Sequence, residues 1–181
     1  SRLTSELKGY LANRRTTLLE GACLSYGQPA YGVFLQILRA LFQLADNDSE
    51  EIAREKIERQ VENLLPSTDT VRVLPYIEHL FSIRIFDKEM VARIRHLAPP
   101  QLQQQTFIAI RELLTAQAQD KPLVLIFEDI HWIDNLSLEM LKFLLGSVES
   151  APLLIYCNSR PAEGPAAAQV EKLGREMYAA N

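Results

Sequence analysis

Three acidic residues stand close together in the segment LVLIFEDIHWID, which runs from Leu123 to Asp134. Five apolar residues lead directly into Glu128 and Asp129, and Asp134 follows a His-Trp pair. Two neighbouring carboxylates at the tip of an apolar strand repel each other and lose hydration, so a cation or a hydrogen-bonding network has to meet them. Such a pair can hold Mg²⁺ with one acid while the other acid orients a water molecule for attack on a phosphate.

The same residues also admit other roles. Asp129 or Asp134 can cap the helix that follows, with Glu128 solvated. His131, together with Glu128 and Asp129, could instead form the site of a metal-dependent hydrolase. A Mg²⁺ site needs no imidazole, so we interpret His131 and Trp132 as packing residues, with Trp132 anchoring the loop and Asp134 capping the next helix.

Alternating strands and helices must position these acids. The apolar runs LVLIF and PLLIYC flank a leucine-rich segment, 135–148, which predicts a strand, a helix and another strand. Continuous apolar runs are typical of parallel strands that helices cover on both faces. A further short strand is predicted around residues 17–24. Because ligands bind beyond the carboxyl ends of such strands, Glu128 and Asp129 should stand at the ligand-binding edge.

Helical patterns fill the sequence between the first two predicted strands. Ser49 is a natural N-cap, with acidic residues in the first turn of the helix that follows. Further helices are expected at the N-terminus, at 30–45, near 76–81, from 87 until the pair Pro99-Pro100 ends the helix, and over 101–119. We therefore expect an α/β core of residues 1–24 and 120–181 and a helical insertion of residues 25–119.

Composition argues against several classes of protein. The 181 residues carry a formal net charge of −4, so no basic excess favours direct binding of nucleic acid. No apolar run approaches the about 18 residues of a membrane span, and the N-terminus lacks the apolar segment of a signal peptide. We therefore expect a cytoplasmic protein without membrane contact. Cys23 and Cys157 lack a metal-binding spacing, and we interpret both as buried thiols.

The segment EDIHWID, followed by NLSLEMLKFLL, resembles the Walker B region of the signal-transduction ATPases of the STAND branch of the AAA-like superfamily. In that family an apolar strand ends in an acid pair, a His-Trp and an Asp follow, and a leucine-rich helix leads to a strand that ends near an arginine. Here that strand is PLLIYCNSRP. The resemblance implies an α/β P-loop NTPase fold, with a partial parallel sheet of about three strands and a long helical insertion between the first two.

The resemblance also implies roles for single residues. Glu128 would hold Mg²⁺, Asp129 would orient the attacking water, and Arg160 would sense the γ-phosphate of ATP. The family often has Asp at the first acid, where this chain has Glu128, so it stays open which of the two acids is the metal ligand and which the base. An arginine in a surface loop, without contact to phosphate, is the alternative for Arg160.

The Walker A motif of such proteins, G-x-x-x-x-G-K-[ST], is absent from the 181 residues. In the resembling family this loop runs into a helix that reads roughly Ser-Arg-Leu and then Glu-Leu, and the chain opens SRLTSEL. The resemblance implies that Ser1 is the last residue of the motif, with its hydroxyl on Mg²⁺ and the glycines and lysine upstream. An ordinary amphipathic helix at a domain boundary is the alternative. Without that lysine we expect the chain alone to bind ATP poorly and to be inactive.

By this resemblance, the intact domain would bind ATP with Mg²⁺ and hydrolyse it slowly, as a conformational switch in a multidomain signalling protein. Its partners would be a covalently attached effector domain, such as a cyclase, a kinase or a DNA-binding domain, together with helical repeats. A nucleotide-dependent oligomer is a further expectation. Two alternatives remain, namely a pseudo-ATPase scaffold or protein-interaction module with vestigial acids, and a metal-dependent hydrolase.

Overall fold

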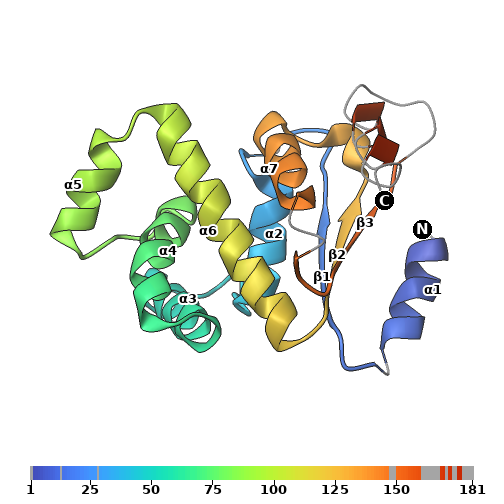
Figure 1. Cartoon of the computed structure of the whole chain (residues 1–181), viewed down its shortest axis with the longest axis horizontal. Helices are drawn as coiled ribbons and strands as arrows, with labels where there is room; N and C mark the ends of the chain where they lie inside the picture. Colours follow the sequence, from blue (N-terminus) through green and yellow to red (C-terminus); the bar gives the residue numbers. More distant parts are fainter. Residues whose placement is uncertain are drawn as a thin grey trace. The chain divides into compact units, whose positions relative to one another are not determined.

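The computed structural model of the chain contains an α/β unit and a helical unit (Figure 1). It describes residues 2–12, 14–27, 29–146 and 150–159, together with 168, 169, 171, 172, 175 and 176. In chain order, the elements are α1 (Arg2–Leu11), β1 (Thr17–Ala22), α2 (Gly32–Leu41), α3 (Glu50–Leu64), α4 (Ser67–Leu80), α5 (Lys88–His96), α6 (Pro99–Asp120), β2 (Leu123–Glu128), η1 (Ile130–Trp132), α7 (Asn135–Leu145) and β3 (Leu153–Cys157).

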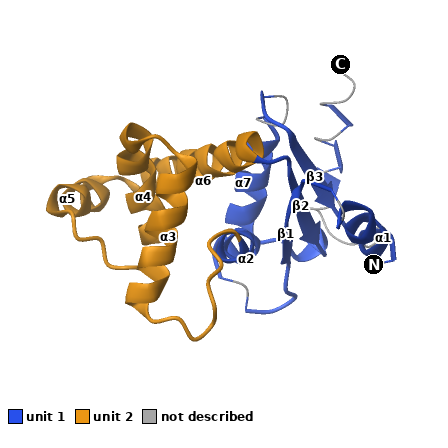
Figure 2. Cartoon of the chain, turned by 90° about the horizontal axis from the view of Figure 1, so that it is seen from below, with its two compact units in different colours: residues 1–40, 121–181 blue, residues 41–120 orange. Residues whose placement is uncertain are grey.

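The chain divides into two compact units (Figure 2). Residues 1–40 and 121–181 form the first unit, and residues 41–120 form the second. The segment 25–40, which contains most of α2, therefore belongs to the unit that holds the sheet, whereas the sequence had suggested that the helical insertion begins at residue 25.

The first unit contains a parallel sheet with the strand order β1-β2-β3, which confirms the predicted α/β fold. β2 is the central strand, and its apolar residues from Leu123 to Phe127 are all buried. The register pairs Ala22 of β1 with Glu128, and Phe127 with Cys157 of β3. The carboxyl ends of the three strands therefore lie at one edge of the sheet.

Helices cover both faces of this sheet. α1 lies against one face, and α2 and α7 lie against the other (Figures 1 and 2). Successive side chains of a strand point to opposite faces. On the first face Lys8 of α1 forms an ion pair with Glu20 of β1. On the second face the ring of Phe34 meets the edge of Phe127, with ring centroids 5.3 Å apart. Glu128 follows Phe127 in the strand and therefore points to the face that α1 covers.

Gly21 of β1 allows α2 to approach the sheet closely. A Cβ atom at this position would lie 2.6 Å from the backbone oxygen of Val33 and 2.7 Å from its Cγ2 atom. The side-chain amide of Gln36 fixes the same approach. Its Oε1 accepts from the Ala22 N–H at 3.0 Å, and its Nε2 donates to the Ala22 carbonyl oxygen at 2.8 Å. These contacts explain why α2 belongs to the α/β unit.

We expect the Gly21→Ala substitution to lower the free energy of unfolding by about 1–3 kcal/mol, because the added methyl group forces the backbone of α2 to shift. Gly9→Ala is the matched control, since a Cβ at Gly9 of α1 would have no atom within 4 Å. That control should be neutral or stabilising by roughly 0.5–1 kcal/mol, because alanine favours a helix over glycine. Urea unfolding measures both variants, and equal stability would contradict the close approach.

The second unit consists mainly of α3 to α6, and α4 packs against both α3 and α6. The longest of these helices, α6, carries several glutamines between its apolar residues. No helix in the described part of the chain combines the length and the apolar character that a membrane span requires. Apolar residues that these helices bury include Ile57, Val61, Val73, Ile77, Ile110, Leu113 and Leu114.

Helix α4 is longer than the sequence predicts. A helix was expected near residues 76–81, but it begins at Ser67 and contains Pro75 in its interior. Val73 and Ile77, four residues apart on one side of the helix, are both buried. The packing of this stripe against α3 and α6 outweighs the helix-breaking tendency of Pro75.

The prediction that the pair Pro99-Pro100 ends a helix is wrong. α5 stops at His96, and Pro99 is the first residue of α6. Proline is well suited to the first position of a helix, because the N–H that it lacks has no partner within the helix at that place. Immediately before it, the Ala98 N–H donates to Oε1 of Gln101 at 3.0 Å, so the start of α6 is also capped.

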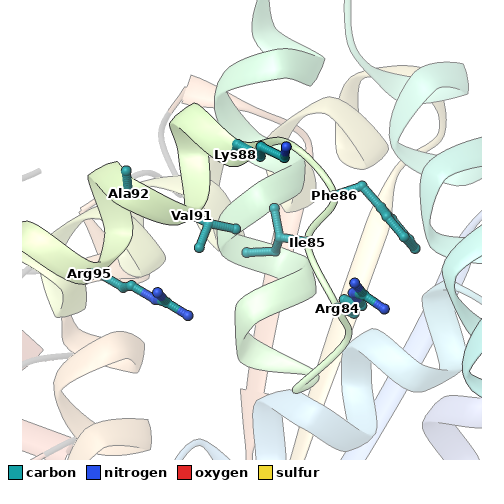
Figure 3. Close-up of a pocket in the computed structure, with 7 residues that line it drawn as sticks. All are labelled: Arg84, Ile85, Phe86, Lys88, Val91, Ala92 and Arg95. Atoms are coloured by element: carbon teal, nitrogen blue, oxygen red, sulfur yellow. The ribbon is translucent and has the colours of Figure 1, made fainter.

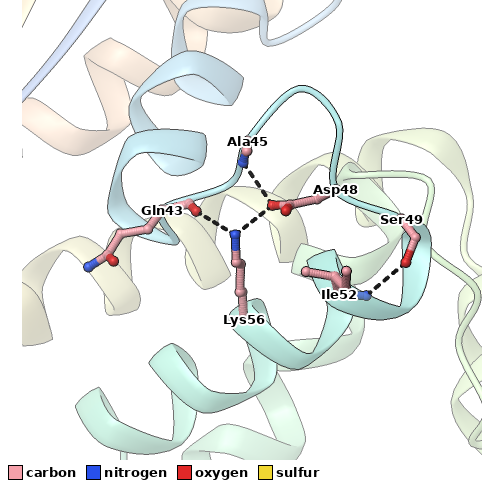
Figure 4. A network of polar contacts seen from close by, with 6 residues as sticks. All are labelled: Gln43, Ala45, Asp48, Ser49, Ile52 and Lys56. Atoms are coloured by element: carbon pink, nitrogen blue, oxygen red, sulfur yellow. Dashed lines mark hydrogen bonds and ion pairs between the residues drawn. The ribbon is translucent and has the colours of Figure 1, made fainter.

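Polar contacts fix the start of α3 (Figure 4). Ser49 is the N-cap, as predicted, and its Oγ accepts from the Ile52 N–H at 3.3 Å. Just before it, Oδ2 of Asp48 accepts from the Ala45 N–H and from Nζ of Lys56, both at 2.7 Å. The loop before α3 is thereby tied to the second turn of that helix.

Glu78 is an acidic residue of α4 that is only 5% exposed. Burial raises the pKa of its carboxyl group, the neighbouring charge of Glu58 raises it further, and Arg54 opposes both, so that the pKa is about 7 instead of 4.5. The folded chain therefore keeps a proton on Glu78 over a pH range in which the unfolded chain has released it.

Stability should consequently fall as the pH rises from 4.5 through about 7, because the unfolded state binds fewer protons than the folded state in this window. In the wild type this decrease in the free energy of unfolding is on the order of 2 kcal/mol. We expect the Glu78→Gln variant to show no such decrease, because its side chain cannot ionise. Glu62→Gln is the control, because Glu62 is exposed on α3. Urea unfolding at several pH values checks the expectation. A Glu78→Gln variant with the wild-type pH dependence would assign that dependence to other groups.

Candidate functional site

Glu128 and Asp129 lie together at the carboxyl end of the central strand. Glu128 is the last residue of β2, and Asp129 follows it in the left-handed conformation, with φ 56° and ψ 43°. Aspartate is one of the few residue types besides glycine that adopt this conformation readily. The turn leads the chain from β2 into η1, so both acids stand at the edge where parallel sheets bind their ligands.

Two polar side chains hold the carboxylate of Glu128. Asn158, just beyond β3, donates from Nδ2 to Oε2 of Glu128 at 2.9 Å. The side chain of Thr4 in α1 forms a second hydrogen bond to the carboxylate. Burial alone would raise the pKa of Glu128, but these hydrogen bonds lower it, and nearby positive charges that include Lys8 lower it further. Glu128 is therefore ionised at neutral pH, and its carboxylate is stabilised by hydrogen bonds from Asn158 and Thr4.

Helix α1 reaches this site through Thr4. Thr4 is only 2% exposed and is the buried residue of α1. One turn later, Lys8 pairs with Glu20 of β1. These contacts hold the first turn of α1 beside the carboxyl end of β2. Ser1, the predicted Mg²⁺ ligand that precedes α1, lies outside the described residues.

Asn158 is a site residue that the sequence patterns did not identify. Its N–H donates to the Phe127 carbonyl oxygen at 2.8 Å, and its own carbonyl oxygen accepts from the Ile130 N–H at 3.0 Å. These backbone bonds extend the pairing of β2 and β3 and place the side chain beside Glu128. A signal was present, because Asn158 is the first residue after an apolar strand that was predicted to lie in the same sheet. Arg160, the predicted γ-phosphate sensor, lies outside the described residues.

The side chain of Asp129 makes no capping hydrogen bond to η1, although its backbone oxygen accepts from the Trp132 N–H at 3.0 Å. The sequence had left open whether Asp129 or Asp134 caps the next helix, and Asp134 has that role. The fold therefore does not use the Asp129 carboxylate as a helix cap.

Asp134 joins the starts of two helices. Its Oδ1 accepts from the Ser137 N–H of α7 at 2.9 Å, which confirms the predicted cap. The same carboxylate accepts from the N–H groups of Tyr31 and Gly32 at the start of α2, each at 3.2 Å. Backbone N–H groups at a helix start have no partner within the helix, so one carboxylate satisfies donors of both helices.

The loop after Asp129 is anchored by isoleucines. Ile130 and Ile133 are 4% and 9% exposed, whereas Trp132 is 39% exposed and lies against the ring of His131, with centroids 4.4 Å apart. The prediction that Trp132 anchors this loop is therefore wrong. In a 3₁₀ turn, residues three positions apart lie on the same side, which places Ile130 and Ile133 together against the core.

The carboxylate oxygens at the carboxyl end of β2 are of the type that binds Mg²⁺. Glu128 and Asp129 offer hard carboxylate oxygens, and Mg²⁺ commonly takes one or two carboxylates together with water and phosphate oxygens. No group of three His, Cys, Asp or Glu side chains that could hold a metal ion occurs among the residues that the structure describes. Glu128, Asp129 and His131 therefore do not form such a group.

The sequence suggested that both cysteines are buried thiols, and the structure confirms this for Cys23 only. Cys23 is 2% exposed, and Cys157 is half-buried at the end of β3. Burial, and to a smaller extent the neighbouring Cys23, raises the pKa of the Cys157 thiol to about 12. This thiol therefore stays protonated at neutral pH and is a poor nucleophile.

We expect Asp134→Ala to lower the free energy of unfolding by about 2–3 kcal/mol, because the Tyr31 N–H before α2 and the Ser137 N–H of α7 both lose their acceptor. Asp87→Ala is the comparison, since Asp87 caps α5 alone by accepting from the N–H groups of Glu89 and Met90. That single cap should contribute about 1 kcal/mol. Urea unfolding compares the two variants, and an Asp134→Ala loss no larger than that of Asp87→Ala would contradict the double cap.

The comparisons with known proteins yield one match. A family model described as AAA ATPase domain matches residues 1–156, which is most of the chain. The matched region contains Thr4, Glu128 and Asp129 and ends within β3. Neither the curated proteins nor the solved structures contain a significant match to the chain.

Proposed function

This chain belongs to the AAA ATPase domain family, and we propose that it supplies the metal-binding and water-orienting acids of a site that hydrolyses ATP. One observation carries the proposal, namely the acid pair Glu128 and Asp129 at the carboxyl end of a buried parallel strand. The lowered pKa of Glu128 keeps that residue charged, as a Mg²⁺ ligand has to be.

In the proposed site each acid has one role. Glu128 is the metal ligand, and Mg²⁺ held there would neutralise charge on the phosphates of ATP. Thr4 and Asn158 orient Glu128 through their hydrogen bonds. Asp129, whose carboxylate caps no helix, accepts a hydrogen bond from the attacking water and positions it.

Other parts of the proposed site come from outside the described residues. We propose Ser1 as a second Mg²⁺ ligand and Arg160 as the γ-phosphate sensor. What supports this assignment is that Thr4 holds the start of α1 beside Glu128, and that Asn158, close to Arg160 in sequence, contacts the same carboxylate. Nucleotide binding also requires a phosphate-binding loop with a lysine, for which these 181 residues hold no motif.

The proposed biological role is that of a switch in a multidomain signalling protein of the STAND type, acting in the cytoplasm. Slow hydrolysis would move an attached effector domain, such as a cyclase, kinase or DNA-binding domain, and helical repeats between two states. A nucleotide-dependent oligomer belongs to the same proposal. The support is the resemblance of EDIHWID and the leucine-rich segment after it to the Walker B region of that group.

In the protein at its natural length, we expect Glu128→Gln and Asp129→Asn each to slow ATP hydrolysis by about a hundredfold or more. The amides keep the size of the side chains but remove the charge. Under the proposed roles, Glu128→Gln raises the Mg²⁺ concentration required for the half-maximal rate, whereas Asp129→Asn lowers kcat and leaves the affinities for Mg²⁺ and ATP intact. Phosphate release measured over a Mg²⁺ titration distinguishes the two effects.

Glu139→Gln is the control for these variants, because Glu139 is an exposed acid on α7 that pairs with Lys142. It should hydrolyse ATP at the wild-type rate. No ATP hydrolysis by the wild-type protein, together with unchanged signalling in both site variants, would instead support the second candidate function, a pseudo-ATPase scaffold with vestigial acids. One observation favours that candidate, since the hydrogen bonds from Thr4 and Asn158 already give Glu128 a structural role.

A further inference from the structure

The helical unit contains a groove between the segment 83–87, which forms neither helix nor strand, and helix α5. Two adjoining hollows of about 430 Å³ each form this groove, and both are lined by Arg84, Ile85, Val91 and Arg95. In Figure 3, Ile85 and Val91 lie side by side in the middle, and the charged ends of Arg84, Lys88 and Arg95 surround them without converging on one point. We name this surface the α5 groove.

The cations of the α5 groove are available to a ligand. Lys88 and Arg95 are exposed, and within the described part of the chain neither forms an ion pair. The guanidinium group of Arg84 lies over the ring of Phe86, 5.2 Å from its centroid, and Phe86 is 63% exposed. The groove therefore combines positive charge with apolar surface that faces solvent.

Two acids beside the groove, Asp87 and Glu50, accept hydrogen bonds from backbone N–H groups. Asp87 accepts from the backbone N–H groups at the start of α5. The carboxylate of Glu50 accepts from the backbone N–H of Arg84 at 2.8 Å. This bond involves the main chain of Arg84 and not the Arg84 guanidinium group. Because the whole chain has a net charge of −4, a local cluster of three cations, none of which forms an ion pair within the described part of the chain, is a distinct feature of this surface.

We propose that the α5 groove binds an acidic peptide segment of a partner protein. One apolar side chain of the segment lies over Ile85 and Val91, and its carboxylates meet the three surrounding cations. Burial of an apolar side chain supplies most of the affinity, and the charge pairs at the rim supply orientation and a faster association.

The same features disfavour other occupants. A small inorganic anion requires donors that converge on one point, whereas the cations here surround an apolar centre. A nucleic-acid backbone requires a longer track of cations, and the net charge of the chain opposes it. An acidic segment with interspersed apolar residues matches both the charge and the apolar lining.

Fluorescence anisotropy tests the proposal with the full 181-residue chain and a labelled synthetic peptide in which pairs of Glu alternate with Leu. We expect this peptide to bind, and added salt to weaken its binding. A peptide with Lys in place of Glu, and one with Ser in place of Leu, should each bind at least about tenfold more weakly, because the first loses charge complementarity and the second loses apolar burial.

Two charge reversals on α5 provide a matched pair of variants. Arg95→Glu places an anion in the groove and should weaken peptide binding about tenfold. Arg93→Glu makes the same change in the same last turn of α5, but Arg93 does not line the groove, so binding should stay within about twofold of wild type. Ala92→Glu is a second test, because it adds an anion at an exposed lining position without removing an existing interaction.

Three results would overturn the proposal. The first is no binding of the Glu-Leu peptide by the folded chain. The second is equal weakening by Arg93→Glu and Arg95→Glu, which indicates attraction by overall charge and not by the groove. The third is tighter binding of a single-stranded oligonucleotide or of phosphatidylserine vesicles than of the peptide, with that binding lost in Arg95→Glu. Circular dichroism of each variant establishes that the helices are intact.

Discussion

The burial of β2 is the constraint on which the α/β unit depends. A fully buried strand has to form backbone hydrogen bonds with a neighbouring strand on each side, and helices have to cover both of its faces. β1 and β3 provide the pairing, α1 covers one face, and α2 and α7 cover the other. Charge is thereby excluded from the body of the strand, and Glu128 is the first position at which an acid can stand.

The alternation of side chains then links the packing of the fold to its acids. Phe127 turns toward α2, where Gly21 permits the close approach, while Glu128 turns toward α1. A buried threonine hydroxyl without a partner costs about 1–3 kcal/mol, so Thr4 is tolerated in the buried face of α1 because Glu128 accepts its hydrogen bond. The same bond helps to keep Glu128 ionised, so the docking of α1 and the charge state of the site depend on each other.

Local patterns predict much of this structure, whereas contacts between distant segments escape them. Apolar runs predict the three strands, and Ser49 and Asp134 are recognisable as caps because a cap acts on residues only a few positions away. Asn158 reaches Glu128 only through the pairing of β2 and β3, and the bonds of Asp134 to the start of α2 join segments far apart in sequence. Pro99 was misjudged for another reason, because proline is compatible with both the end and the start of a helix.

The ionised state of Glu128 does not by itself separate a catalytic role from a structural one, because both require a charged carboxylate. Asp129 does separate them. Glycine or asparagine would adopt the left-handed conformation at this position equally well. The Asp129 side chain makes no capping hydrogen bond that would offset its repulsion from the adjacent Glu128. Stability alone would therefore favour an uncharged residue at position 129. A cation or a water molecule that meets both carboxylates accounts for the aspartate, so the catalytic interpretation depends more on Asp129 than on Glu128.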